Sequence, residues 1–577
     1  MNQARLLTAF IISIALVACN GLGKMAKNAS KVKYEVTPNP LEMHGDSVAI
    51  AIKGTYPPKY FAKTVDVAVT PSIKTSEGDH KFKSVTVVGE KSKSNGEKIN
   101  SKAGGSFSYS DKIAFTPDMK AGDVMVTPVG SKGTTTKEFG PMKIADGTIV
   151  TPLLVMHDEK TIIGKDQFRR VEPVAFNGQI FYLINTSNVN TGFKDKDCAI
   201  SNKKEMANID SVVKMYSAAP YSIKGMSVSG YASPDGKQKL NTDLANNRTN
   251  SSVKYLSGAM KKSKTPVPAD SSFFTKSSTS EDWDGFQKLM QESDMSQKDM
   301  ILRIVASNSD PEAREMEIKK MGMAYTEIAD KILPKLRRSQ VTVNGEKTGR
   351  SDEEISRLAT SSPDSLSVEE ILYAGTLASD NNQKLTIYKS AERIYPQDWR
   401  TANNTGMTMF MMNDVDGAMS EFNKADQLSA NNTVVKNNLG AAYSRKGDRK
   451  KAAEMYAAAG SSPETSQNMG ILDIRNGNYS AAVGHYGSEN TFNAALAKLL
   501  SGDKDGAMAT INASPDKESA MGYYLKAVIS ARKDDAAGVT SNLASATRKD
   551  ASLKAMASQD REFLKWFNDA SFKHAVE

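Results

Sequence analysis

The sequence predicts a multidomain protein with an N-terminal β-sandwich, a central α+β domain and a C-terminal all-α solenoid of repeated helix pairs. Three observations support this division. Short apolar runs separated by turn residues fill the first part of the chain, and strand-like and helix-like apolar spacings alternate in the middle. In the last part, small and aromatic residues recur at one constant spacing.

Length and composition indicate a globular, non-fibrous chain. A chain of 577 residues is too long for one core, and about 150 residues per domain would give about four folded units, of which the patterns identify three. Hydrophobic residues make up 39% and charged residues 24% of the sequence. The net charge of +9 is modest because 75 Lys+Arg are interspersed with 66 Asp+Glu, so no basic arm indicates nucleic-acid binding.

The segment 1–18 has the pattern of an export signal. Arg5 supplies a positive charge, and Leu6 to Val17 form an apolar stretch too short to span a bilayer. The ending Leu16-Val-Ala-Cys19 resembles the bacterial lipobox, which implies cleavage after residue 18 and acylation of Cys19 by fatty chains such as palmitate. A plain secretory signal is the alternative. Residues 19–33 then read as a polar tether, and no later run is long enough to span a membrane.

Only two cysteines occur, so Cys198 has no partner once Cys19 is acylated. A disulfide framework is therefore excluded. Because no histidine lies near Cys198 in the sequence, we expect a small buried residue rather than a nucleophile.

Residues 34–165 read as the β-sandwich. Five runs have strand length and are separated by turn chemistry such as Tyr56-Pro-Pro58. They are Ser47 to Ile52, Val65 to Val69, Ser84 to Val88, Lys112 to Phe115 and Asp123 to Thr127. No residue pattern in this region indicates a site, so a spacer or docking role is the preferred interpretation.

Residues 365–577 contain the repeat. The matching positions, all at the same separation, are Gly406 and Gly440, Ala418 and Ala452, Phe422 and Tyr456, and Ala425 and Ala459. This period, about 34 residues, and this choice of small and aromatic residues resemble the tetratricopeptide repeat. We expect about five helix pairs in a curved solenoid, whose concave face binds protein. The sequence leaves open whether a partner or another part of this chain occupies that face.

Residues 172–345 combine strands and helices. Ile180 to Asn185, Ile223 to Val228, a run near Phe273 and Ser339 to Val343 read as strands, and apolar residues from Met206 to Tyr216 recur at helical spacing. A helical insertion is expected at about 281–336. The order of these elements predicts an α+β domain.

A motif within this region indicates a binding site. A glycine-led loop, Gly230 to Gly236, precedes a helix with the pattern N-x-x-L-x-x-x-R, formed by Asn241, Leu244 and Arg248. Asn241 and Arg248 are seven positions apart, nearly two turns, and therefore share a helix face. Gly236 allows the loop backbone to close over that face. A guanidinium placed there can give two parallel hydrogen bonds to a ligand carboxylate.

The loop, this helix pattern and the pair Arg337-Arg338 resemble the OmpA C-terminal peptidoglycan-binding family, over roughly a third of the chain. The residue sequence of the loop resembles variants found in outer-membrane proteins of Bacteroidota. The resemblance implies that a peptidoglycan stem peptide binds at Arg248, with further contacts from the residues Asn241, Ser233, Asp235 and Tyr231.

One residue departs from the family pattern. Ser233 stands where the family commonly carries the aspartate that receives the ligand's ammonium group, and the loss of that charge weakens a hydrogen bond by about 1 to 2 kcal/mol. Asp235 is placed to compensate. The alternative role for Arg248 is a surface ion pair with Asp243 or Asp235.

Catalytic patterns are not found. The sequence has five histidines, none in H-E-x-x-H, and no phosphate-binding loop or nucleophile elbow. We therefore expect a non-enzymatic protein without cofactor or metal. The predicted function is that of a lipid-anchored protein on the periplasmic face of the outer membrane, which binds peptidoglycan non-covalently and recruits a protein partner through its repeats. The alternative is a scaffold subunit of an envelope assembly or secretion complex, with a degenerate OmpA-like domain.

Overall fold

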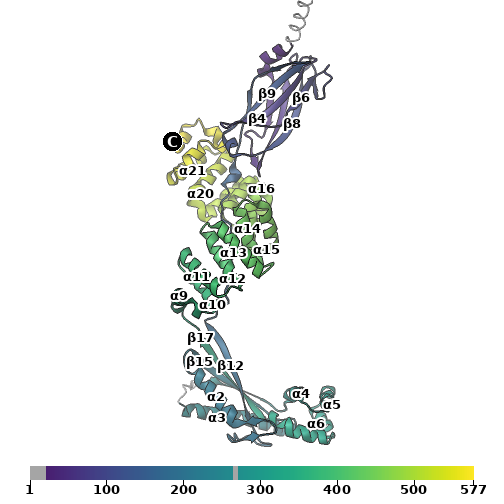
Figure 1. Ribbon diagram of the computed structural model, residues 1–577, viewed down its shortest axis with the longest axis vertical. Coiled ribbons are helices and arrows are strands. Elements are labelled where there is room, and N and C mark those ends of the chain that lie inside the picture. Colours follow the sequence, from purple (N-terminus) through teal and green to yellow (C-terminus); the bar gives the residue numbers. More distant parts are fainter. Residues whose placement is uncertain (1–20, 264–270) are drawn as a thin grey trace, which may run out of the picture. The chain divides into compact units, whose positions relative to one another are not determined.

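The computed structural model describes residues 21–263 and 271–577 (Figure 1). The chain forms two compact units: residues up to Lys165 together with Ser379–Glu577, which we call the β-repeat unit, and Asp166–Ala378, the central unit. Within the described ranges, no helix has both the length and the apolar character that crossing a membrane requires. Cys19, the predicted acylation site, lies outside the described residues.

The N-terminal part of the β-repeat unit consists mainly of two sheets. Side chains along β3 alternate between buried and exposed, and Phe107 of one sheet shares a core with Val67 and Val126 of the other. The β-rich region predicted from the sequence is therefore confirmed, and the five predicted strands overlap β3, β4, β6, β8 and β9. One sheet has the order β1 (Lys33–Thr37), β3 (Ser47–Tyr56), β2 (Met43–His44), with β8 (Gly105–Ala114) paired to β3. The other has the order β10 (Thr135–Glu138), β9 (Asp123–Lys132), β4 (Asp66–Lys74), β6 (Val85–Gly89), β7 (Glu97–Ile99), with β11 (Met142–Asp146) on β9 and β5 (Asp79–Lys81) on β4.

Two segments differ from the sequence-based expectation at the edges of this region. Residues 21–27, expected in a polar tether, are helical, and Leu22 and Met25 pack into the core beneath the sheets. The tether prediction failed because these two apolar residues are isolated in a polar sequence. At the other end, the strands stop at Asp146, and residues 147–165 leave the sheets through the short helix η3 (Thr151–Leu154).

The central unit is built around a four-stranded sheet. The strand order is β12 (Val171–Phe181), β17 (Arg338–Thr348), β15 (Tyr221–Tyr231), β16 (Phe274–Thr279), and only β15 and β16 run parallel. Helices α2 (Asn202–Tyr216) and α3 (Gln238–Lys262) contact the sheet. Their apolar faces, with Ile209 and Leu256, share its core with Val341 and Val343. The mixed α/β character predicted for this region is confirmed.

The helical insertion between β16 and β17 forms a core of its own around Phe286, Met290 and Ile328. Cys198 is buried beside Phe181 and Ile200, as expected for a residue without a nucleophilic role, and burial raises the pKa of its thiol. The insertion contains α4 (Trp283–Glu292), α5 (Lys298–Ser307), α6 (Pro311–Lys319), α7 (Met323–Lys331) and α8 (Leu333–Leu336). Two more helices, α9 (Asp352–Ser361) and α10 (Val368–Leu377), also belong to the central unit, although the sequence placed residues from 365 onward in the repeats.

The C-terminal part of the β-repeat unit consists of tetratricopeptide-type repeats. Five helix pairs follow α11 (Asn381–Ile394) within the described residues, which matches the number expected from the sequence. The pairs are α12 (Trp399–Met411) with α13 (Val415–Leu428), α14 (Thr433–Arg445) with α15 (Arg449–Ala459), α16 (Pro463–Asn476) with α17 (Tyr479–Tyr486), α18 (Phe492–Leu500) with α19 (Lys504–Ala513), and α20 (Ala520–Arg532) with α21 (Ala536–Lys549). The chain ends with α22 (Leu553–Ala557), η7 (Arg561–Trp566) and α23 (Ala570–Val576).

The small and aromatic positions of the repeat explain how each helix pair packs. A Cβ atom added at Gly440 would lie 2.5 Å from the ring of Tyr456, and one added at Gly406 would lie 2.8 Å from the ring of Phe422. Only glycine permits these contacts, so the repeated glycines lie where the two helices of a pair approach each other most closely.

Candidate functional site

The predicted ligand-binding arginine lies inside the central unit. Arg248, on α3, is 1% exposed, and its guanidinium donates to main-chain carbonyls. Nη1 donates to Tyr231 O at 2.8 Å and Nε to Thr186 O at 3.0 Å, while Nη2 lies 3.5 Å from Leu183 O. The guanidinium carbon also lies 5.2 Å from the ring centre of Tyr182.

These contacts come from the segment that follows β12. Leu183 and Thr186 of this segment present their carbonyls to the guanidinium, which lies near the middle of α3. Burial, the largest influence, lowers the pKa of Arg248 to about 10, although the side chain stays cationic at neutral pH. The donors that the sequence assigns to a ligand carboxylate therefore already have acceptors within the chain.

The other predicted contact residues lie around this arginine and are also bonded to one another. Asp235 forms an ion pair with Arg337 at 3.2 Å and accepts a short hydrogen bond from Ser233. Asn241, buried on α3, donates to Gly236 O at 3.1 Å, which holds the glycine loop against the helix. Tyr231 contributes its carbonyl to Arg248 and its ring to Arg338, 4.8 Å away.

The loop and helix lie where the sequence predicted them, but the described contacts of Arg248 do not include the ion pair with Asp243 or Asp235 that the sequence offered as an alternative. Arg248 bonds to main-chain carbonyls, and the carboxylate of Asp235 is matched by Arg337. Asp243 makes none of the described contacts of Arg248. Peptidoglycan binding at these residues stays a prediction.

A second site, which the sequence analysis did not find, lies in the repeats of the β-repeat unit. Residues 155–165, which we call the groove strap, run in an extended conformation along the first helices of four successive helix pairs. The strap and the repeats run in opposite directions, because Met156 contacts α18 and Gly164 contacts α12. The groove of the repeats thus binds an extended polypeptide, and this polypeptide is part of the same chain.

Four asparagines, which we call the asparagine ladder, hold the strap by its backbone. Each side-chain amide accepts a hydrogen bond from the N–H and donates one to the carbonyl of the same strap residue. The pairs are Asn493 with Met156 (2.8 and 3.0 Å), Asn468 with Lys160 (2.7 and 2.8 Å), Asn438 with Ile162 (2.7 and 2.8 Å), and Asn404 with Gly164 (2.7 and 3.0 Å). Such two-point contacts replace the ladder of a neighbouring β-strand and do not depend on the strap's side chains.

A second row of polar side chains fixes the orientation of these amides. Asn403 and Asn437 donate to the carbonyls of Ile162 and Lys160 and also to the Oδ1 atoms of the ladder residues that follow them in sequence. Both are fully buried, as are Asn404 and Asn438. Because every buried amide has partners, the network is satisfied and orders the groove.

One strap side chain makes a charged contact in addition. Glu159 has a fully buried side chain whose Oε2 lies 2.8 Å from Arg445 Nη2 and whose Oε1 lies 3.1 Å from Arg475 Nη1. Burial acts to raise the pKa of this carboxyl group, but the charges of Arg475 and Arg445 outweigh it and the pKa is lowered. The carboxylate thus fixes the register of the strap between two repeats.

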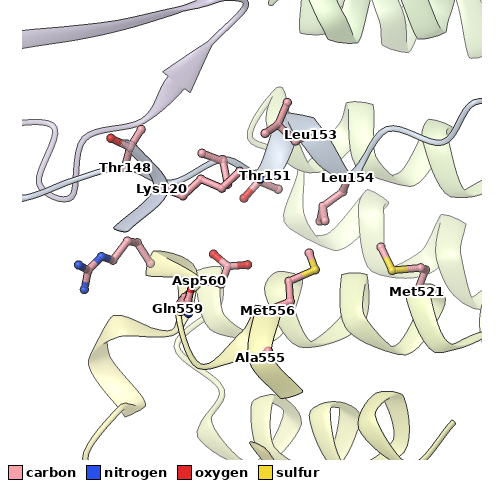
Figure 2. A pocket seen from close by; sticks show the side chains of 12 residues that line it. Lys120, Thr148, Thr151, Leu153, Leu154, Met521, Ala555, Met556, Gln559 and Asp560 are labelled. Atoms are coloured by element: carbon pink, nitrogen blue, oxygen red, sulfur yellow. The ribbon is translucent and has the colours of Figure 1, made fainter. Parts of the chain in front are cut away.

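The helix η3, which precedes the strap, borders a cavity of about 560 Å³ between η3 and the last helices of the chain (Figure 2). Leu154, Met521 and Met556 form its apolar wall, and the carboxyl group of Asp560 faces it. Burial raises the pKa of Asp560 to about 6, while Tyr524 donates to the carboxyl group at 2.7 Å. Thr151 of η3 donates a short hydrogen bond to Glu562, which ties the two walls together.

The comparisons with known proteins concern the repeats. Models of protein families and curated protein sequences gave no match. Among solved structures, the chain is similar to the APC/C hetero-tetramer Cut9–Hcn1, with 13% identity and a TM-score of 0.33 over 51% of this chain. This chain spans about half, 53%, of that Cut9–Hcn1 chain.

Two further similar structures are tetratricopeptide-repeat proteins. YrrB, described as having an unusual peptide-binding site, is 18% identical with a TM-score of 0.24, over 28% of this chain and 92% of its own. A repeat protein from Parabacteroides merdae is 14% identical with a TM-score of 0.29, over 37% of this chain and 91% of its own.

A signal for the ladder was present in the sequence. Asn404 and Asn438 are separated by the same interval as the repeat glycines Gly406 and Gly440, and each stands two positions before its glycine. Asn468 stands in the same place before Gly470. A polar residue repeated at a position next to the tightest helix contact indicates a buried polar function rather than a solvent face.

Proposed function

We propose that this protein is a non-enzymatic scaffold of the cell envelope, whose repeats bind a segment of their own chain in the groove and a protein partner at their remaining surfaces. The observation that carries this proposal is the asparagine ladder, which binds an extended polypeptide by its backbone. The chemistry of the groove suits polypeptide recognition, since its amides bind the backbone of the strap and its two arginines bind the carboxylate of the strap residue Glu159.

Occupation of the groove has a structural consequence for the scaffold. The strap directly follows the β-rich region and η3, so its burial in the groove fastens that region to the repeats as one body. The free surfaces of this body, rather than the filled groove, are then the places where a partner binds.

The proposal includes a lipid anchor at Cys19, which rests on the resemblance of residues 16–19 to the lipobox. An acyl chain contributes about 0.8 kcal/mol per buried methylene, so several chains hold a protein firmly at a membrane. We place the protein at the periplasmic face of the outer membrane because the residues after Cys19, Asn20 to Lys24, carry no acidic run that would send it to the outer surface.

For the OmpA-like domain, we favour the degenerate form. The guanidinium of Arg248 donates to three carbonyls of its own chain, and the position expected to carry a ligand-binding carboxylate is Ser233. A stem-peptide carboxylate could reach Arg248 only after residues 183–186 moved away. Peptidoglycan binding is the second candidate, favoured by the fact that Ser233, Asp235 and Asn241 do gather around one loop.

Two measurements separate these candidates. Site-specific cross-linking in intact cells should capture a defined protein partner, whereas purified sacculi mixed with the full-length protein should not pellet it. A variant with Ser233→Asp restores the missing carboxylate and serves as the matched gain-of-function control. Pelleting of the unmodified protein that is lost in Arg248→Ala, without any captured protein, would replace the scaffold assignment by wall binding.

A further inference from the structure

A basic pocket lies on the β-repeat unit beside the groove strap. Its volume is about 510 Å³, and it is lined by the loop before β3, by the start of the strap and by the ends of α14, α15 and α16. The residues that matter for its chemistry are Arg445, Arg449, Arg475, His157 and Asp46. It shares only the lining residue Leu153 with the apolar cavity of Figure 2.

The pocket holds more positive than negative charge. Arg445 and Arg475 share the single carboxylate of Glu159. Arg449 donates through Nη1 to Asp46 at 2.6 Å and to the carbonyl of Arg475 at 2.9 Å. Three guanidinium groups are therefore balanced by two carboxylates, and concave walls concentrate the resulting field.

His157 adds a hydrogen-bond donor rather than a second acceptor. Its Nδ1 lies 2.6 Å from Arg475 Nη2, and because a guanidinium can only donate, Nδ1 must accept. Burial and then the charge of Arg475 lower the pKa of His157, so the ring is neutral at pH 7 and its proton is on Nε2. The ring is exposed, so this N–H is available to a ligand.

The chain itself shows which group these arginines bind. Glu159, presented by an extended segment, inserts its carboxylate between Arg445 and Arg475. The remaining arginine, Arg449, has as its carboxylate partner Asp46, whose side chain is 71% exposed and contacts a single guanidinium nitrogen. Such an exposed one-point pair is weak and is readily exchanged for another carboxylate.

We propose that this pocket binds an acidic side chain from an extended segment of a partner protein, with Arg449 as the main contact and Asp46 as the group that is displaced. A carboxylate in the plane of the Arg449 fork accepts two parallel hydrogen bonds, which Asp46 does not use. Met43, Pro152 and Leu153 form an apolar wall beside it, so the acidic residue is expected to be flanked by an apolar one. This inference rests on the proposed role as a protein scaffold.

The test uses the full-length protein and short labelled peptides, acetylated and amidated, in which leucine alternates with glutamate. Fluorescence anisotropy should show saturable binding that weakens at least tenfold when glutamine replaces glutamate. Arg449→Gln should weaken binding by about the same factor, and Asp46→Asn should strengthen it because the competitor is removed. Arg548→Gln, on the exposed face of α21, is the matched control and should change nothing.

Three outcomes would overturn the inference: equal binding of the glutamine peptide, unchanged binding in Arg449→Gln, or competition by inorganic phosphate at the same concentration as by the acidic peptide. The last outcome would indicate a site for small free anions. Failure of the peptide to bind while cross-linking in cells still captures a partner would refute the pocket alone. Failure of both would refute the scaffold.

Discussion

Removing two rungs of the asparagine ladder should release the groove strap while the repeats stay folded. In Asn438→Ala with Asn468→Ala, the amide N–H groups of Ile162 and Lys160 lose their acceptors at 2.7 Å. A buried donor left without a partner costs about 1 to 3 kcal/mol, and each lost bond to a carbonyl costs about 0.5 to 1.5 kcal/mol more. Each substitution should therefore lower the free energy of local strap opening by about 2 to 4 kcal/mol.

Amide hydrogen exchange measures this opening directly, because a protein of several units does not unfold in one global step. For one substitution, a loss of about 2 to 4 kcal/mol corresponds to exchange roughly 30- to 900-fold faster in residues 156–164, and the double variant should exchange faster still, up to the limit set by the next opening motion. Asn382→Ala, on the exposed start of α11, is the control. Unchanged exchange of the strap in the double variant, or an equal change in the control, would refute the role of the ladder.

Four further perturbations test other contacts. Glu159→Gln leaves two partly buried arginines without a counter-charge; breaking a fully buried pair costs about 3 to 5 kcal/mol, so this change should cost less than that and should speed tryptic cleavage within the strap. Gly440→Ala places a methyl group 2.5 Å from the ring of Tyr456 and should destabilise the repeats by about 1 to 3 kcal/mol, seen as a lower melting temperature. Because the pKa of Asp560 is raised to about 6, the folded state favours the protonated form, and stability present at low pH is lost as the pH rises through about 6. Asp560→Asn should therefore raise the melting temperature at pH 8 but leave it nearly unchanged at pH 4, and the same shift at both pH values would contradict this reading. Arg248→Ala removes one donor from each of three carbonyls, of which Leu183 O keeps its bonds to Thr186, and should destabilise the central unit by about 2 to 4 kcal/mol in denaturant titration, whereas a variant of wild-type stability would show that the guanidinium is free for a ligand.

Repeat spacing predicted the helical part of the fold well because it reflects direct packing. Gly440 and Tyr456 are found in the sequence by their type and by the repeat interval, and they meet in the structure because only glycine lets the two helices approach. The same reasoning holds for Gly470 and Tyr486 in a shortened repeat. The alternation of buried and exposed side chains along β3 made the β-rich region equally predictable from the sequence.

The groove strap could not be predicted in this way. Its contacts join residues far apart in the sequence and use the strap's backbone, so its side chains carry almost no trace of them. Sequence patterns report side-chain burial, and the strap, with five consecutive polar residues from His157 to Thr161, resembles a polar connection at the end of a β-domain. The sequence of the repeat helices that contact the strap was more informative, since Asn404 and Asn438 repeat at positions where an apolar residue is expected.

The contacts of Arg248 could not be predicted from its motif for a related reason. The loop from Gly230 to Gly236 and the helix face carrying Asn241 were located correctly by spacing. The acceptors of Arg248, however, are carbonyls of Leu183, Thr186 and Tyr231, and main-chain atoms have no sequence signature. A motif identifies a charged group but not whether the chain itself already satisfies it.

The tethering of the strap decides where partners can bind. A segment joined to its groove by a short linker has an effective concentration in the millimolar range, so a free peptide with the same backbone contacts, present at micromolar concentration, is disfavoured about a thousandfold. Backbone contacts alone cannot overcome this difference, because the ladder treats all extended chains alike. A partner therefore gains more from side-chain chemistry outside the groove, where the exposed Asp46 is a far weaker competitor for Arg449 than the strap is for the ladder.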